Sequence, residues 1–70
     1  MKETKFGLNT KLKGLGYVDA QSGNDLHAMK SLAGSVFHLK RVESVCVYDM
    51  DGTPRLYLKK TPQGVYKEER

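Results

Sequence analysis

The chain has 70 residues, of which 39% are hydrophobic and 29% charged, and its 12 Lys and Arg exceed its 8 Asp and Glu to give a formal net charge of +4. This composition is too apolar for a disordered tail and too polar for a membrane protein, and the length excludes a Rossmann unit or a barrel. A single cysteine excludes an intramolecular disulfide scaffold.

The length predicts one domain covering residues 1–70. A chain of this size buries only about 60% of the surface that its unfolded form exposes, and its core supplies roughly 3–5 kcal/mol of stability. Such a core benefits from a partner or from self-association, so a homodimer is left open.

No apolar run approaches a membrane span, and no apolar segment after Lys2 and Lys5 indicates a secretory signal. With Cys46 unpaired, a reducing cytoplasm is the expected compartment.

Residues 4–12 alternate between two kinds of side chain, which predicts a half-buried strand. The apolar face carries Thr4, Phe6, Leu8, Thr10 and Leu12. The polar, basic face carries Lys5, Gly7, Asn9, Lys11 and Lys13. Gly14 and Gly16 permit a reversal, and residues 15–20 predict a short return strand.

Residues 21–25 predict a loop in which Asn24 or Asp25 caps the start of a helix. The helix is expected from an apolar stripe at spacings of three and four, formed by Leu26, Met29, Leu32, Ala33 and Val36. Gly34 is expected to end this helix or to weaken its last turn. Residues 35–41 then form a connector.

Residues 42–50 are rich in β-branched and aromatic side chains, and Asp51-Gly52 predicts a two-residue hairpin turn with positive φ at both positions. This turn sets the register of the returning strand over residues 53–60. The predicted pairs are Val47–Leu56, Val45–Leu58, Tyr48–Arg55, Cys46–Tyr57, Ser44–Lys59 and Glu43–Lys60, the last as a weak ion pair. A second turn over residues 61–64 leads to a strand over 65–68, with Val65 on the core side and Tyr66 beside Lys59.

The predicted order is therefore strand, strand, helix, strand, strand, strand. We expect an α+β fold, with one antiparallel β-sheet of four to five strands and one α-helix packed on one face. The second face of the sheet then stays open to solvent. It is expected to carry the partner-binding residues Lys5, Lys11, Tyr48, Arg55, Tyr57, Lys59 and Tyr66.

The segment Asp49-Met50-Asp51-Gly52-Thr53 matches the DxDGT signature of haloacid-dehalogenase-type phosphatases. In that family the first Asp is a nucleophile, the second is a general acid/base, and a magnesium ion joins them. Only seventeen residues follow Thr53, too few for the doubly wound domain that this chemistry needs. A hairpin turn accounts for the same residues. We therefore expect no phosphatase activity, so that an Asp49→Asn substitution would have none to remove.

Other chemical motifs are weaker. Cys46 could pair with His27 or His38 as a nucleophile, but a half-buried strand cysteine is the commoner case. No CxxC or HxxxH spacing is present, so we expect no zinc site, and Gly14-Leu15-Gly16 reads as a tight turn rather than a phosphate-binding loop. We therefore expect a non-enzymatic protein without a metal or cofactor.

Tyrosines interleaved with Lys and Arg on one sheet face suit two kinds of partner. The rings can stack on bases while the cations meet phosphates, and the same residue types are enriched in protein hot spots. A merely soluble surface explains the pattern as well, because open sheets often carry exposed tyrosines. A secondary basic patch is formed by His38, Lys40 and Arg41.

The element order and three segments, Ala28-Met29-Lys30-Ser31-Leu32-Ala33, Phe37-His38 and Arg41-Val42-Glu43, resemble small phage-encoded anti-CRISPR proteins of the type I-F inhibitor kind. The resemblance spans the C-terminal two thirds in topology, with few matching residues, a shorter connector after the helix and a different turn. It implies a non-enzymatic protein that docks on a nucleoprotein complex and blocks nucleic-acid binding. The charge of +4 suits an acidic protein groove or a phosphate backbone, not DNA mimicry.

We therefore expect a small interaction protein of phage or mobile-element origin, acting in the host cytoplasm, that inhibits a nucleoprotein complex through a basic, tyrosine-bearing sheet face. The alternative is an accessory or regulatory protein that binds DNA or RNA directly through the same face.

Overall fold

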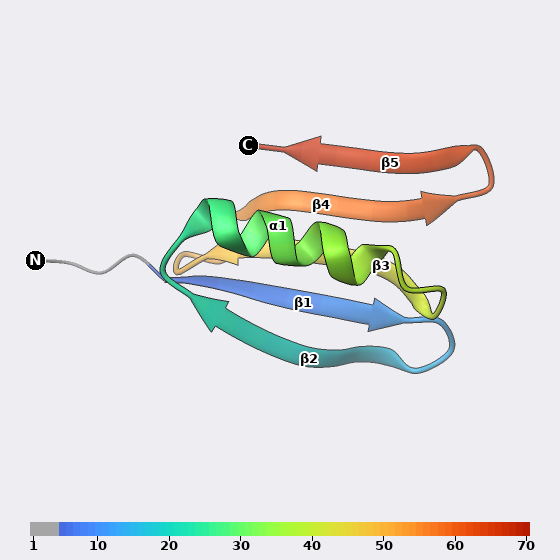
Figure 1. Cartoon of the computed structure of the whole chain (residues 1–70), viewed down its shortest axis with the longest axis horizontal. Coiled ribbons are helices and arrows are strands. Elements are labelled where there is room, and N and C mark those ends of the chain that lie inside the picture. Colours follow the sequence, from blue (N-terminus) through green and yellow to red (C-terminus); the bar gives the residue numbers. More distant parts are fainter. Residues whose placement is uncertain (1–4) are drawn as a thin grey trace, which may run out of the picture.

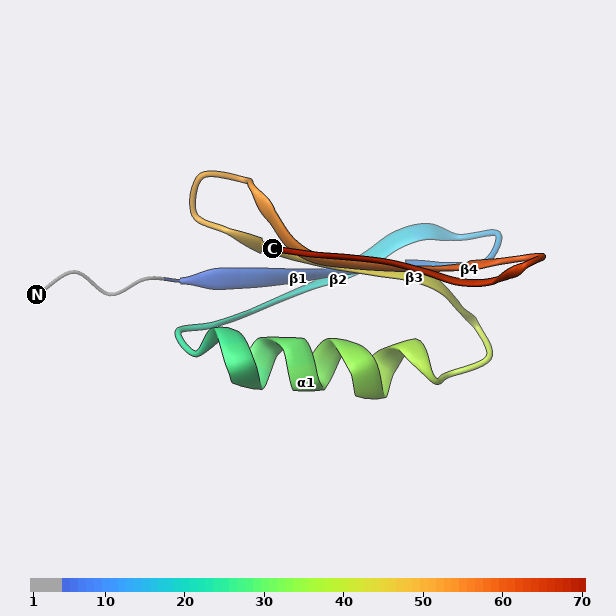
Figure 2. The same cartoon turned by 90° about the horizontal axis from the view of Figure 1, so that it is seen from above.

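The computed structural model describes residues 5–70, with the backbone alone for residues 17–20. Its elements are β1 (Phe6–Leu12), β2 (Gly16–Gly23), α1 (Leu26–Phe37), β3 (Val42–Asp49), β4 (Pro54–Thr61) and β5 (Gly64–Glu69). The strands form one antiparallel sheet in the order β2-β1-β3-β4-β5, and α1 lies against one face of it (Figures 1 and 2). The predicted α+β class is confirmed. Thr4, which we expected on the apolar face of the first strand, lies outside the described residues.

The core lies between α1 and the middle of the sheet. The alternation in β1 turns Phe6 and Leu8 toward the helix, and Val45 and Val47 of β3 do the same beside them. The helix packs on β3, β1 and β2. The buried apolar residues are Phe6, Leu8, Met29, Ala33, Phe37, Val42, Val45, Val47 and Leu56.

The helix begins as the sequence predicts and ends later. The Asp25 carboxylate caps it by accepting hydrogen bonds from the backbone N–H groups of His27 at 3.0 Å and Ala28 at 3.3 Å. The expectation that Gly34 ends the helix is wrong, because α1 continues to Phe37. The buried Phe37 ring offsets a glycine cost of about 1 kcal/mol. Among the described residues no helix is long and apolar enough to span a membrane.

The β3–β4 hairpin has the predicted register along most of its length but not the predicted turn. The pairs Val47–Leu56, Val45–Leu58, Cys46–Tyr57 and Ser44–Lys59 are confirmed. Gly52 has a φ of +81° and its N–H donates to the Asp49 carbonyl at 3.0 Å, whereas no non-glycine residue among those described has positive φ. The turn is therefore not the predicted two-residue turn. Its longer loop shifts the register, so that Tyr48 lies opposite Pro54 rather than Arg55.

Two further pairings near this hairpin differ from the prediction. Glu43 pairs with Lys11, at 3.2 Å between Oε2 and Nζ, instead of with Lys60. The Lys60 ammonium donates to the Leu39 carbonyl at 2.7 Å and lies 5.1 Å from the centre of the Phe37 ring. These contacts hold the loop after α1 against β4.

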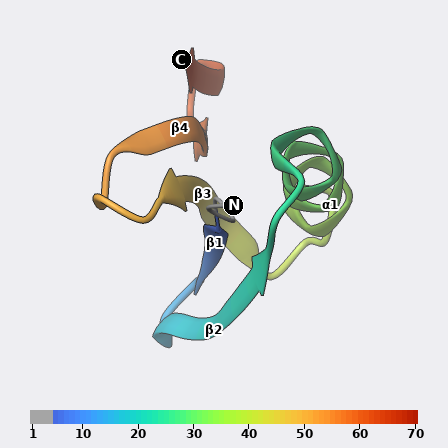
Figure 3. The same cartoon turned by 90° about the vertical axis from the view of Figure 1, so that its left-hand side faces the viewer.

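The strand β5 is confirmed, and Tyr66 lies opposite Lys59 as predicted. Val65 lies on the core side of the sheet as predicted, opposite Lys60, but it does not join the core, since its side chain is 62% exposed. The reason is the width of the sheet: α1 covers the part formed by β1 and β3, while the β4–β5 hairpin extends beyond it (Figures 1 and 3). The molecule is accordingly elongated, with extents of 44 × 22 × 19 Å.

Candidate docking surface on the open sheet face

The sheet face turned away from α1, called the open face below, carries the side chains that alternate with the core residues. The strand register arranges them in three rows across the sheet. The rows are Lys11, Ser44, Lys59 and Tyr66; Asn9, Cys46, Tyr57 and Glu68; and Gly7, Tyr48 and Pro54. The predicted residues Lys11, Tyr48, Tyr57, Lys59 and Tyr66 thus share one face, which α1 leaves uncovered (Figure 2).

The outer end of the Tyr48 ring packs against a glycine of the neighbouring strand. It is the cross-strand partner of Gly7, and a Cβ atom added to Gly7 would come within 2.7 Å of Cε2 of the Tyr48 ring. Gly7 is buried beneath this ring, and Tyr48 is half-buried. Gly7 and Tyr48 line a shallow hollow of about 340 Å³. Lys5, one of the predicted binding residues, and Ser22 line the same hollow.

Two tyrosines from neighbouring strands are in contact. The rings of Tyr57 and Tyr66 are 6.0 Å apart between centres and meet edge to face at 64°, an arrangement that aromatic pairs favour. The Tyr66 hydroxyl donates to Glu68 at 3.2 Å, and this hydrogen bond with the nearby negative charge raises the pKa of Tyr66. Tyr66 therefore stays a neutral hydrogen-bond donor throughout the physiological range.

The carboxylates near the cations of this face were not predicted from the sequence. Glu43 is a partner of Lys11. Asp49, at the end of β3 and opposite the core residue Phe6, lies 3.9 Å from the Arg55 guanidinium, whose Nε also donates to the Arg70 carbonyl at 3.3 Å. Glu68 stands in the same row as Tyr57. The charge pattern of the sequence could not reveal these pairs, because they depend on the bulge at Glu43 and on the turn geometry. The open face is therefore mixed in charge rather than uniformly basic.

Lys59 differs from Lys11 and Arg55, which have carboxylate neighbours. Its side chain is exposed, and it has no ion pair with any of residues 5–70 whose side chains are described. It lies between Ser44 and Tyr66 in its row. Lys59 is thus a cation of this face that is well placed, beside Tyr57 and Tyr66, to meet an anionic group.

The secondary basic patch lies at the end of the molecule and not within the three rows. His38, Lys40 and Arg41 are exposed in the connector after α1. Lys40 and Arg41 line a hollow of about 360 Å³ with Lys13, Leu12 and Leu15. The structure thus separates this patch from the tyrosines.

The DxDGT segment closes the β3–β4 turn. One carboxylate oxygen of Asp49, Oδ1, accepts hydrogen bonds from the backbone N–H groups of Asp51 at 2.9 Å and Thr53 at 3.0 Å. Asp49 therefore has a structural partner set that accounts for the motif. Among the residues with described side chains, no group of three His, Cys, Asp or Glu is placed to hold a metal ion.

Cys46 lies in the middle of the open face and is half-buried. Burial raises the pKa of its thiol, so the protonated form, which is the poorer nucleophile, predominates near neutral pH. His27 belongs to α1 on the opposite side of the sheet, where it lines a groove with Lys30 and Leu58. His38 caps the end of the same helix. The structure therefore brings neither histidine to Cys46 as a catalytic base.

Comparison of the chain with protein-family models, with curated proteins and with solved structures gave no match.

Proposed function

We propose that this chain is a small non-enzymatic interaction protein that docks on a nucleoprotein complex through the open face and inhibits it. The observation that carries the proposal is a set of tyrosines that runs diagonally over three neighbouring strands of the face that α1 leaves uncovered: Tyr48 on β3, Tyr57 on β4 and Tyr66 on β5. Tyrosine offers a large contact area with few rotatable bonds, and it is enriched among residues that dominate binding energy.

The charges of the open face favour a protein contact within that complex. Lys11 and Arg55 already have carboxylate neighbours, and Glu68 adds another negative group beside Tyr57. A phosphate backbone laid across this face would approach all of these carboxylates, whereas a protein surface can match positive and negative groups in turn. Lys59, beside Tyr57 and Tyr66, supplies the contact for an acidic group of the partner.

The inhibitory role and the phage origin come from the resemblance to anti-CRISPR proteins. A protein of that kind acts in the cytoplasm of the host cell and needs no cofactor. Blocking requires only that the docked chain occupies the surface where nucleic acid binds, and an elongated molecule of 44 Å covers such a surface well. Inhibition thus follows from the place where the protein docks, without chemistry of its own.

Direct binding of DNA or RNA through the same face is the second candidate. It is favoured by Lys59 next to Tyr57 and Tyr66, because rings can stack on bases while the ammonium meets a phosphate. Binding to plain nucleic acid would weaken steeply as salt rises.

The test is a capture experiment from bacterial lysate, with and without nuclease, followed by affinity measurement on the captured complex. We expect Tyr57→Ala with Lys59→Ala to lower affinity by about tenfold or more, since the centre of an interface carries most of its energy. His27→Ala with Ser31→Ala, on the exposed side of α1, is the matched control and should bind normally. The melting temperatures of both variants should stay close to that of the wild type.

The two candidates give different results in this experiment. Capture that survives nuclease supports the protein partner, while capture lost with nuclease and a gel shift at low salt support direct nucleic-acid binding. Unchanged affinity of the Tyr57 and Lys59 double variant would contradict both, because both use the open face.

A further inference from the structure

The strand β5 is an exposed edge of the sheet. It lies at one end of the sheet, all six of its residues are exposed, and its register with β4 runs without a shift from Gly64 to Glu69. The opposite edge strand, β2, carries a register shift against β1 between Thr10 and Lys11. Bulges, proline and charged side chains are the usual means of preventing strand addition. β5 has no bulge and no proline, and its charges are those of Lys67, Glu68 and Glu69.

The backbone groups on the outer side of β5 can be assigned from one hydrogen bond. The Arg70 N–H donates to the Arg55 carbonyl of the neighbouring segment at 2.9 Å, so residue 70 directs its backbone inward. In an antiparallel ladder the inward and outward directions alternate along the strand. Val65, Lys67 and Glu69 therefore direct their N–H and C=O groups away from the sheet.

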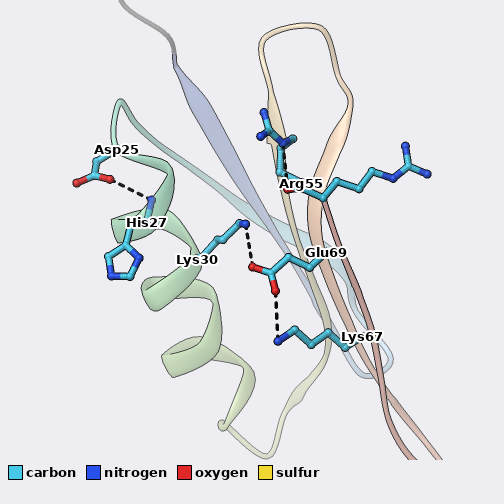
Figure 4. A network of polar contacts seen from close by, with 7 residues as sticks. Asp25, His27, Lys30, Arg55, Lys67 and Glu69 are labelled. Atoms are coloured by element: carbon cyan, nitrogen blue, oxygen red, sulfur yellow. Dashed lines mark hydrogen bonds and ion pairs between the residues drawn. The ribbon is translucent and has the colours of Figure 1, made fainter.

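The helix does not block this edge. It packs on β3, β1 and β2, whereas β5 lies at the far end of the sheet, as the end-on view shows (Figure 3). The ion pair between Lys30 and Glu69, at 2.8 Å, links the helix to β5 on the inner face and leaves the outer backbone accessible (Figure 4).

The charges of β5 match those of a second copy running in the opposite direction. Lys67 and Glu69 project on the same face, two residues apart, and already approach each other at 3.3 Å within one chain. If two β5 strands pair around a twofold axis at Glu68, Lys67 of each copy lies opposite Glu69 of the other. On the other face, Tyr66 lies opposite Arg70, which suits a cation–π contact.

We propose that β5 is a dimerisation edge, at which a second copy of this chain adds antiparallel to form a continuous ten-stranded sheet. Each copy supplies the outward backbone groups of Lys67 and Glu69, and the two Lys67–Glu69 pairs set the register. The two Glu68 carboxylates face each other at the axis and repel, with Arg70 of each copy two residues away. This repulsion makes the dimer reversible rather than permanent. The proposal does not depend on the proposed function, since it concerns the chain alone.

The first test separates the backbone contact from the side chain. Proline at position 67 removes an outward N–H that β4 does not use, so the monomer should fold normally. We expect Lys67→Pro to raise the dimer dissociation constant by about tenfold or more, because backbone hydrogen bonds across the axis are lost. Lys67→Ala keeps the N–H and should retain most of the dimer. Analytical ultracentrifugation over a concentration series measures the association, and circular dichroism checks the fold.

The second test examines the register by mixing two variants. In Lys67→Glu the two copies would oppose Glu to Glu, and in Glu69→Lys they would oppose Lys to Lys, so each variant alone should dimerise weakly. In a mixture, each chain places opposite charges against the other at both positions. We expect a heterodimer that forms more tightly than either homodimer, detected by native mass spectrometry.

Three results would overturn the proposal. One is a wild-type chain that stays monomeric up to millimolar concentration, which includes the case in which β5 accepts only a strand from another protein. A second is a dimer that Lys67→Pro does not weaken, because it would use another surface. The third is a mixture of the charge variants that stays monomeric, because the assigned register would then be wrong.

Discussion

Among individual residues, the most specific contact of the molecule is the packing of Tyr48 on Gly7. A glycine in a strand normally weakens it, but here the missing side chain makes room for a ring from the neighbouring strand. The end of the ring covers the bare backbone of Gly7. Position 7 therefore needs a glycine because a larger side chain would collide with the Tyr48 ring. The alternating pattern of the strand alone does not indicate this.

Gly7→Ala tests this packing. The added methyl group would come too close to the end of the Tyr48 ring, and this half-exposed side chain would swing outward. We expect a loss of about 1 kcal/mol in the free energy of unfolding, at the low end of overpacking effects because the ring can move. In the wild type, the ring current should shift the Gly7 Hα signals upfield in NMR spectra. Tyr48→Ala is the control that abolishes this shift, and Tyr48 ring signals that do not move in Gly7→Ala would contradict the packing.

Asp49 shows at the same scale how a motif can be explained by structure. The letters Asp49 to Thr53 match a phosphatase signature, yet the Asp49 carboxylate binds two backbone N–H groups of its own turn. A short acidic side chain before a glycine serves turn closure as well as catalysis. Only the hydrogen bonds of the folded hairpin distinguish the two roles.

At the scale of the element, α1 and β5 are linked by one cluster of charges. Glu69 on β5 lies 2.8 Å from Lys30 of α1 and 3.3 Å from Lys67 of its own strand (Figure 4). The hydrogen bond from Lys30, followed by that from Lys67, lowers the pKa of Glu69 below its ordinary value of 4.5. This cluster spans the uncovered groove between the helix and the β4–β5 hairpin.

The sign of its pH dependence follows from the lowered pKa. Glu69 favours the folded state above the ordinary glutamate pKa, and this contribution disappears as the pH falls through the lower, folded value. We expect the Glu69 carboxyl signal in an NMR titration to have its midpoint below 4.5. Lys30→Gln should raise that midpoint, whereas Lys13→Gln, at the exposed turn after β1, should leave it unchanged. A midpoint that Lys30→Gln does not move would show that the ion pair does not form in solution.

At the scale of the whole molecule, stability depends on one thin layer between α1 and the middle of the sheet. Leu8, Val45 and Val47 are at most 1% exposed, while every residue of β5 is exposed. The β4–β5 hairpin is therefore held mainly through β3 and by the contacts of Lys60 and Lys30. The buried core therefore lies at the β1–β3 side of the sheet, and the exposed edge lies at the β5 side.

Removal of one buried side chain from this layer should be enough to unfold the chain. Leu8→Ala removes a fully buried side chain, at a cost of about 2–5 kcal/mol, which is comparable with the roughly 3–5 kcal/mol that a core of this size supplies. We expect most of the variant to be unfolded at 25 °C by circular dichroism and urea titration. Leu15→Ala makes the same change at a side chain that is 71% exposed, and it should alter stability by less than about 0.5 kcal/mol. A cooperative transition in Leu8→Ala close to that of the wild type would place the core elsewhere.

Local sequence patterns were enough to predict the elements, the class of the fold and most of the hairpin register, because alternation, capping and turn residues act over short distances. Asp25, Val47 and Leu56 illustrate this, since each has the role that its neighbours in the chain predict. The site was predicted in part, because alternation brings Tyr48, Tyr57 and Tyr66 to one face.

Other features of the molecule depend on tertiary contacts that no local pattern encodes. The continuation of α1 past Gly34 depends on the burial of Phe37, and the exposure of Val65 depends on the width of the sheet relative to one helix. The carboxylates near the cations of the open face were placed by a bulge and by a turn that shifts the strand register. Strand order also exposed β5 as an edge, because pairing between distant strands is set by packing around the shared core and not by local pattern.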